Sequence, residues 1–339
     1  MDKNEVIKAI ERRNPQRLPC LYGWMAAETM AKYKDAAKDL LQAYQDDLIL
    51  EAISFSPSAN LTQTEWRDEW GITWRRSPAA GAMGVNSELR DWNALNHYLK
   101  EGFPDLDLQG RFDHITETVA KNPNTYVIAT WWLCQLEMFR AFRGTENFLM
   151  DLYLHQRELM TLGEALTDFF IRLIRKLAKC GADGVMLSDD FGTQHSLLFS
   201  PKHWRQLFKP WYKRMIREIH YHGMHALLHT CGYIEDIIPD FVELGLDVLH
   251  LGNPYLMDIE KIVNNFKEDI CFFGGCDVQS LSKKKPEEIR RDVERAVKLF
   301  GSKEGGFILA PTNSITPDVS LENIEALFRA MKKYSSFYS

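Results

Sequence analysis

Residues 181–190, GADGVMLSDD, and residues 224–231, MHALLHTC, stand on either side of a helix signal. The apolar runs Gly184–Ser188 and Met224–His229 predict two short buried strands. Between them, Ser200-Pro201 supplies a cap residue and a proline for the first turn of a helix that we expect to reach about His220. A strand, a helix and a second strand in this order predict one unit of a parallel sheet.

The same pattern recurs along the chain. Short apolar runs predict eight strands, at Leu18–Trp24, Leu48–Phe55, Tyr126–Trp131, Gly184–Ser188, Met224–His229, Asp247–Leu251, Ile270–Phe273 and Gly306–Ala310. Eight strand–helix units predict an α/β fold of the (β/α)8 TIM barrel type. A chain of 339 residues, 45% of them hydrophobic, suffices for one such barrel, so we expect residues 1–339 to form a single domain.

One interval is too long for a single connection between strands. Residues 56–125 follow the second predicted strand and contain WRDEWGITW at 66–74, in which Gly71 and the alternation of Ile72 and Trp74 predict a hairpin. An insertion after the carboxyl end of a barrel strand covers the catalytic face. We therefore expect residues 56–125 to form a lid over the barrel.

Composition excludes several classes of protein. A formal net charge of -6 gives no basic footprint for nucleic acid. No apolar stretch approaches the roughly 18 residues that a membrane span needs, and the charged start MDKNE is unlike a signal peptide. Six cysteines spread over 339 residues are too sparse for a disulfide scaffold, so we expect a cytoplasmic protein with reduced thiols.

The clearest functional signal is His229-Thr230-Cys231-Gly232 at the end of a predicted strand. Residues two apart in a strand share a face, so His229 and Cys231 point the same way. Imidazole and thiolate are ligands that zinc favours. A second cysteine, Cys276, follows the predicted strand Ile270–Phe273. We expect His229, Cys231 and Cys276 to bind a zinc ion whose fourth position stays open for substrate.

Other polar and aromatic residues follow predicted strand ends and would surround the same mouth of the barrel. Asp189 and Asp190 are candidate catalytic residues; since neighbours in a strand point oppositely, we expect one of the two to serve the site. The candidate substrate-binding residues are Tyr22, Trp24, Trp131, Trp132, His195, His250, Asn253 and Asn313. Core packing is the alternative for the aromatic rings, and a structural role is the alternative for His195 and His250.

Several segments together resemble the uroporphyrinogen decarboxylase (URO-D) superfamily. The resemblance covers nearly the whole chain and rests on Arg12–Pro19, Asp68–Gly71, Gly181–Gly184 with Asp189-Asp190, Ser200–Trp204, His229–Gly232, Gly245–Asp247 and Pro317–Asn323. It implies an (α/β)8 barrel, in agreement with the predicted strands. The superfamily includes decarboxylases of porphyrin biosynthesis and zinc-dependent methyltransferases that pass methyl groups to or from corrinoid proteins.

The resemblance is closer to the methyltransferase branch. Decarboxylases carry arginines after the first strand, an aspartate after the second and a histidine after the eighth, whereas the matching segments Leu21–Glu28, Ser54–Pro57 and Ala310–Asn313 lack them. Without arginines, the carboxylates of a porphyrinogen would enter the pocket unpaired. The methyltransferases bind zinc through His-x-Cys and a distant cysteine. The branch that methylates coenzyme M has this cysteine after strand eight, where Ala310–Ser314 has none, and Cys276 is the neighbouring alternative.

The resemblance thus implies a zinc-dependent methyltransferase that moves a methyl group between a small substrate, with aryl ethers among the candidates, and a corrinoid. We expect a separate protein to carry the corrinoid, because the chain has no Asp-x-His-x-x-Gly string. Homodimers occur in the superfamily. Two alternatives stay open: a decarboxylase acting on uroporphyrinogen, and an inactive member that binds a ligand.

Overall fold

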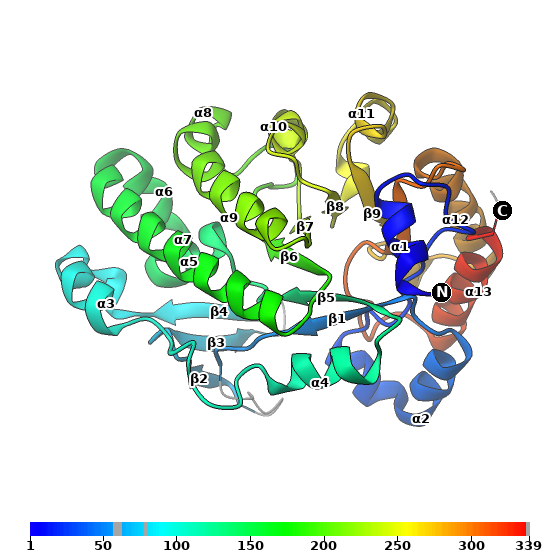
Figure 1. Cartoon of the computed structure of the whole chain (residues 1–339), viewed down its shortest axis with the longest axis horizontal. Helices are drawn as coiled ribbons and strands as arrows, with labels where there is room; N and C mark the ends of the chain where they lie inside the picture. The colour runs from blue at the N-terminus through cyan, green and yellow to red at the C-terminus, as the bar shows by residue number, and fades with distance from the viewer. Residues whose placement is uncertain (57–62, 78–80, 337–339) are drawn as a thin grey trace.

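A computed structural model describes residues 1–56, 63–77 and 81–336 of the chain. Its centre is a parallel sheet with the strand order β1-β5-β6-β7-β8-β9-β10, which curls around an apolar interior in the manner of a TIM barrel (Figure 1). The strands are β1 Leu48–Ala52, β5 Tyr126–Thr130, β6 Gly184–Ser188, β7 His225–Thr230, β8 Val248–Leu251, β9 Cys271–Cys276 and β10 Phe307–Pro311. These seven match the second to eighth strands predicted from the sequence.

The first predicted strand, Leu18–Trp24, is extended but pairs only through isolated bridges. Cys20 is bridged to Leu309 of β10, and Leu309 N donates to Pro19 O at 2.9 Å. On the other side, Asp47 N donates to Cys20 O at 2.9 Å just before β1 begins. Proline has no N–H to donate to a ladder, so Pro19 interrupts regular pairing here. The segment nevertheless occupies the eighth position of the barrel.

Helices connect the strands and lie outside the sheet (Figure 1). They are α1 Lys3–Ile10, α2 Ala27–Ala43, α5 Gln135–Arg143, α6 Thr145–Leu154, α7 Gln156–Lys179, α8 Pro201–His203, α9 Lys209–Tyr221, α10 Ile238–Glu243, α11 Ile259–Phe266, α12 Pro286–Phe300 and α13 Leu321–Tyr334. Ser200 caps α8 by accepting from His203 N at 3.3 Å, and a π-helix at Trp204–Phe208 joins α8 to α9. None of the helices in the described ranges is both long and apolar enough to cross a membrane.

The insertion after β1 forms a small antiparallel sheet. Its strands are β2 Glu65–Arg67, β3 Thr73–Ser77 and β4 Gly81–Asn86, and its helices are α3 Leu95–Glu101 and α4 Asp113–Lys121. Trp66 pairs with Trp74 in the expected hairpin, and β4 adds a third strand that the sequence pattern did not predict. Asp68 fixes the turn by accepting from Ile72 N at 2.8 Å and Trp74 Nε1 at 2.7 Å. Residues 57–62 and 78–80 of the expected lid lie outside the described residues.

Alternation along each strand assigns side chains to two separate cores. Met186 of β6 and Leu227 of β7 pack in the barrel interior, whereas Leu187 and Leu228 pack between the sheet and the outer helices. The same alternation continues two and four residues beyond Met186 and Leu227. It directs Ser188 and Asp190, and likewise His229 and Cys231, toward the interior at the carboxyl ends of the strands. The candidate site lies there.

Candidate functional site

The loops after β6 and β7 touch, and two glycines permit the contact. A Cβ on Gly192 would lie 2.3 Å from Tyr233 N, and one on Gly232 would lie 2.3 Å from backbone atoms of Gly192. Gly232 also has a φ of +82°, which side chains other than that of glycine rarely adopt. The close approach brings Asp190, which follows β6, beside Cys231, which follows β7.

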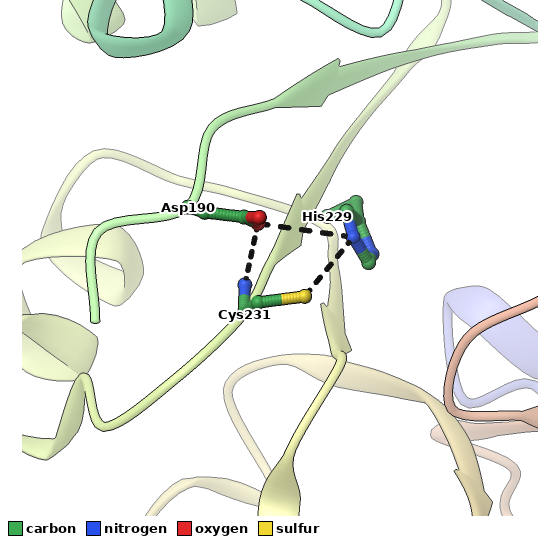
Figure 2. Close-up of side chains that lie close together, drawn as sticks. All are labelled: Asp190, His229 and Cys231. Atoms are coloured by element: carbon green, nitrogen blue, oxygen red, sulfur yellow. Dashed lines mark hydrogen bonds and ion pairs between the residues drawn. The ribbon is translucent and has the colours of Figure 1, made fainter. Parts of the chain in front are cut away.

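Asp190, His229 and Cys231 direct one donor atom each at a common space (Figure 2). His229 Nε2 lies 3.6 Å from Cys231 Sγ and 3.9 Å from Asp190 Oδ1. Cys231 N donates to Asp190 Oδ1 at 2.9 Å and so orients this carboxylate. The three donor atoms lie within 4.8 Å of one another, and we call these residues the donor group.

His250 contacts His229 through the Nδ1 atoms of both rings and fixes the tautomer of His229. His250 Nε2 lies 3.3 Å from Pro311 O, which can only accept, so this nitrogen carries the proton. His250 Nδ1 then accepts from His229 Nδ1, 2.7 Å away, because a buried neutral imidazole has one donor and one acceptor nitrogen. His229 Nε2 is left with a lone pair that faces Cys231 and Asp190. Burial lowers the pKa of both histidines and keeps the rings neutral.

The sulfur of Cys231 is closely surrounded by neighbouring residues. Asn313 Nδ2 donates to its Sγ at 3.5 Å, and a Cβ on Gly252 would lie only 2.4 Å from the same atom. Burial, followed by the charge of Asp190, raises the pKa of the Cys231 thiol. A thiolate here therefore needs a cation between it and Asp190.

The donor group fits a zinc ion. Zinc bonds of about 2.0 Å to nitrogen or oxygen and about 2.3 Å to sulfur place neighbouring ligand atoms of a tetrahedron roughly 3.3 to 3.5 Å apart. The nitrogen–sulfur separation of 3.6 Å comes close to the upper value, and the nitrogen–oxygen separation of 3.9 Å is longer than the range. One nitrogen, one sulfur and one carboxylate oxygen are ligands that zinc accepts, and three protein ligands leave a fourth position open, as in catalytic sites. The tautomer of His229 with a lone pair on Nε2 is the form that binds a metal through this nitrogen.

A cavity of about 270 Å³ opens beside the donor group and includes Asp190 and His229 in its lining. Trp24 and Trp132 form its aromatic wall, with ring centroids 5.8 Å apart, and Trp24 lies 5.8 Å from the His229 ring. Trp132 has a φ of +61°, a conformation rare for a bulky residue, which turns the chain between β5 and α5. Asn313 also lines this cavity.

Asp189 points away from the site, into the outer layer. Its carboxylate accepts from Leu136 N at 2.9 Å, Glu137 N at 2.8 Å and Tyr212 Oη at 2.6 Å. The first two are free backbone donors in the first turn of α5, so Asp189 caps this helix from a distance. Burial raises its pKa to about 8, against the effect of these donors. Of the two expected catalytic aspartates, only Asp190 adjoins the cavity.

The structure does not bring Cys276 into the donor group, in contrast to the trio expected from the sequence. Cys276 packs in the core between the sheet and the outer helices, whereas Phe273 of the same strand packs in the barrel interior. Between the two residues, Gly274 and Gly275 have φ values of +114° and +84°, so the regular alternation of β9 is interrupted there. In the described structure Asp190 takes the third place beside His229 and Cys231.

The remaining expected residues lie around or away from the cavity. Tyr22 is buried against Tyr44 and Phe328, and His195 is exposed on the loop after β6. Asn253 accepts from Gly232 N at 3.0 Å and so braces the loop after β7. Trp131 lines a neighbouring cavity of about 180 Å³ and stacks on Phe170.

Four residues in the lining of the 270 Å³ cavity were missed by the sequence prediction: Leu133, Glu137, Ser188 and Ser314. Glu137 is the notable one, because it is a carboxylate at the start of α5 that pairs with Arg140 at 2.6 Å. Burial raises its pKa. Its position after the predicted strand Tyr126–Trp131 is the signal that could have identified it.

Comparisons with known proteins identify the family of the chain. Residues 128–334, more than half of the chain, match the family described as Uroporphyrinogen decarboxylase (URO-D). A uroporphyrinogen decarboxylase of Hydrogenobaculum sp. is 25% identical over 204 residues, which are 60% of this chain and 56% of that protein. The Methylcobamide:CoM methyltransferase MtaA of Methanosarcina barkeri is 24% identical over 178 residues, which are 50% of this chain and 47% of that protein. The chain thus spans about half the length of the curated relatives it matches.

Solved structures share the fold over a longer range. A methyltransferase from Methanosarcina mazei superimposes with a TM-score of 0.72 at 15% identity, covering 99% of both chains. A B12-independent methionine synthase from Shewanella superimposes with a TM-score of 0.52 at 11% identity, covering 95% of each chain. The match over residues 128–334 assigns the protein to its family: the chain belongs to the uroporphyrinogen decarboxylase (URO-D) family.

Proposed function

We propose that this chain is a zinc-dependent methyltransferase that moves a methyl group between a small substrate and a corrinoid held by a separate protein. The observation that carries the proposal is the donor group, which lies at the carboxyl ends of β6 and β7 and opens onto a cavity walled by Trp24 and Trp132. Active sites of TIM barrels lie at this end of the strands. The relative named Methylcobamide:CoM methyltransferase supports the same class of reaction.

The proposed ligands are His229, Cys231 and Asp190. Zinc bound there supplies Lewis acidity that makes the oxygen, nitrogen or sulfur next to the methyl group a better leaving group or nucleophile. The chain's own residues tune this site: His250 holds the His229 tautomer, and Asn313 donates a hydrogen bond to the Cys231 sulfur. Partners of this kind orient metal ligands and raise metal affinity.

The cavity walls give the remaining residues their roles. The indoles of Trp24 and Trp132 exclude water from one side of the reacting methyl group and hold an apolar substrate by packing. The side chain of Asp190 is 42% exposed and lines the cavity, where it orients a polar substrate atom. The corrinoid partner docks over this mouth, where Asp68 and Trp70 of the insertion line the neighbouring cavity.

Decarboxylation of uroporphyrinogen is the second candidate, favoured by the Hydrogenobaculum relative. That substrate carries many carboxylates, which a binding site normally pairs with arginine or lysine. No lysine or arginine lines the cavities at this mouth within the described ranges. Methyl transfer is therefore the better supported function.

Metal content tests the proposal. We expect purified protein reconstituted with zinc to hold one zinc per chain after dialysis, measured by mass spectrometry of the metal. Cys231→Ser and Asp190→Asn should each lose most of it. Cys276→Ser is the matched control and should retain it. The proposed ligands are wrong if Cys231→Ser keeps its zinc, or if Cys276→Ser alone loses it.

A turnover assay separates the three functional alternatives. We expect zinc-loaded protein to demethylate methylcobalamin in the presence of a thiol, or to methylate cob(I)alamin from a methyl donor. Metal-free protein that converts uroporphyrinogen would support the decarboxylase instead. Absence of both metal binding and turnover would support an inactive ligand-binding member.

A further inference from the structure

Three separate cavities near the candidate site all have Trp132 in their lining. Their volumes are about 180, 490 and 270 Å³. The second and third also share Trp24 and Ser314, and the third contains Asp190 and His229 of the donor group. We call this set the mouth cavities. A substrate of the proposed reaction would enter the 270 Å³ cavity, with the other two cavities beside Trp132.

The charged side chains that line the mouth cavities are all acidic. They are Asp46, Asp68, Glu137 and Asp190, and no lysine or arginine is among the described lining residues.

Two arginines that contact residues of the cavity lining are already paired. Arg140 donates to Glu137 at 2.6 Å. Arg111 lies over the ring of Phe55 and forms an ion pair with Glu69. Neither guanidinium lines a mouth cavity, so neither is positioned to receive a substrate anion.

The carboxylates are also held in place by the fold. Asp46 accepts from Gly23 N at 3.1 Å, Asp68 from Trp74 Nε1 at 2.7 Å and Asp190 from Cys231 N at 2.9 Å. An anion that entered the mouth cavities would lose its water and meet these carboxylates without a cation in return, which is unfavourable. Zinc would not reverse this balance, because one thiolate and one carboxylate of the donor group neutralise a divalent ion.

We propose that the mouth cavities select an uncharged substrate, such as a methoxylated aromatic ring without an acid group, and exclude the same molecule when it carries a carboxylate or sulfonate. The aromatic part of this inference comes from the walls of Trp24 and Trp132, which offer flat apolar surface. The charge rule comes from the all-acidic lining. The identification of the bound molecule as methyl donor or acceptor rests on the proposed function, whereas the charge rule concerns binding alone.

A pair of probes that differ only in one carboxylate tests the charge rule. Guaiacol is uncharged at neutral pH, and vanillate is the same ring with a carboxylate. We expect calorimetric titration to show guaiacol binding at least about tenfold more tightly than vanillate, in both zinc-free and zinc-loaded protein. The pair 2-mercaptoethanol and 2-mercaptoethanesulfonate tests a sulfonate in the same way. Equal or tighter binding of the anion in both pairs would overturn the proposal.

Adding one positive charge to the lining gives a gain-of-function test. Ser314 lines two of the mouth cavities without belonging to the donor group. We expect Ser314→Lys to raise vanillate affinity by about tenfold or more while guaiacol binding changes little. Ser314→Met has a similar length without the charge and should leave the preference for guaiacol intact. Equal effects of the two substitutions would show that charge does not set the selectivity.

The result is separable from the proposed function because binding and turnover are measured independently. If guaiacol is preferred but no methyl group moves to cob(I)alamin, the charge rule stands and the proposed reaction fails. If vanillate is demethylated as efficiently as guaiacol, the reaction stands and the charge rule fails.

Discussion

The Nδ1 atoms of His229 and His250 lie 2.7 Å apart, and one proton is shared between them. The direction of this hydrogen bond is set by Pro311, whose carbonyl lies 3.3 Å from the other nitrogen of His250. Trp24 stacks on His250, with ring centroids 4.6 Å apart at 25°, and holds the ring in position. A backbone carbonyl of β10 therefore determines which nitrogen of His229 is available to a metal.

Removing the His250 imidazole should weaken zinc binding without removing a ligand. In His250→Phe, His229 Nδ1 loses its partner, and the proton can move to Nε2, where it blocks the metal. We expect zinc affinity to fall by about 10- to 100-fold, the usual cost of losing such a partner, in a competition titration with a chelator. His195→Phe, on an exposed loop, is the control and should bind zinc as the wild type does. Unchanged zinc affinity in His250→Phe would contradict this role of His250.

A salt bridge at the opposite ends of the strands gives a pH dependence of stability with a definite sign. His220, near the end of α9, lies 2.7 Å from Asp247, and this hydrogen bond raises the pKa of His220. The pKa of His220 is about 6.5 in the unfolded chain and higher in the folded chain, so between these two values the folded chain binds more protons. The stabilisation by this salt bridge is therefore full below pH 6.5 and is lost as the pH rises through the folded pKa.

The expected size is small because both side chains are partly exposed. In urea unfolding of metal-free protein, we expect wild type to exceed His220→Gln by about 0.5 to 1 kcal/mol at pH 6 and by less at pH 8. A difference that grows with pH would contradict the assigned pKa direction. The wild-type curve alone is not diagnostic, since Asp189 and the buried histidines titrate as well.

Asp189 and Asp190 are adjacent in sequence yet should differ in what they contribute to stability. Asp189 receives three donors, from Leu136 N, Glu137 N and Tyr212 Oη, so the amide nitrogen of Asp189→Asn must face at least one of them. We expect a loss of about 1 to 3 kcal/mol in the free energy of unfolding. Asp190→Asn keeps one oxygen for Cys231 N and should stay within about 0.5 kcal/mol in metal-free protein. Similar losses in the two variants would contradict this division of roles.

The sequence pattern predicted seven of the barrel strands because parallel strands buried on both faces are continuous apolar runs. The exception, Leu18–Trp24, has the apolar composition of a strand, but Pro19 removes one ladder donor. The hairpin around Gly71 followed from local turn chemistry, whereas β4 did not, because its pairing with β3 depends on tertiary packing against α5.

The site was predictable where it depends on alternation along a single strand. His229 and Cys231 share a face by the period of two, and the same rule separates Asp189 from Asp190. In β9 the rule does not apply, because Gly274 and Gly275 have positive φ values that interrupt the alternation before Cys276. Glu137 and the contact of Gly192 with Gly232 could not be deduced in this way, because they depend on how α5 and two loops pack in three dimensions.

Gly252 offers the sharpest steric test of the donor group. It follows β8, and a Cβ there would lie 2.4 Å from Cys231 Sγ, so Gly252→Ala must displace the sulfur from its position beside His229. No ligand is removed, yet we expect zinc affinity to fall by about 10- to 100-fold, comparable with the loss of a supporting residue. Gly223→Ala is the control for alanine at a glycine position: its Cβ meets nothing within 4 Å, although its φ of +71° carries backbone strain. If Gly252→Ala binds zinc as tightly as Gly223→Ala does, the Cys231 sulfur is not a ligand in the position described.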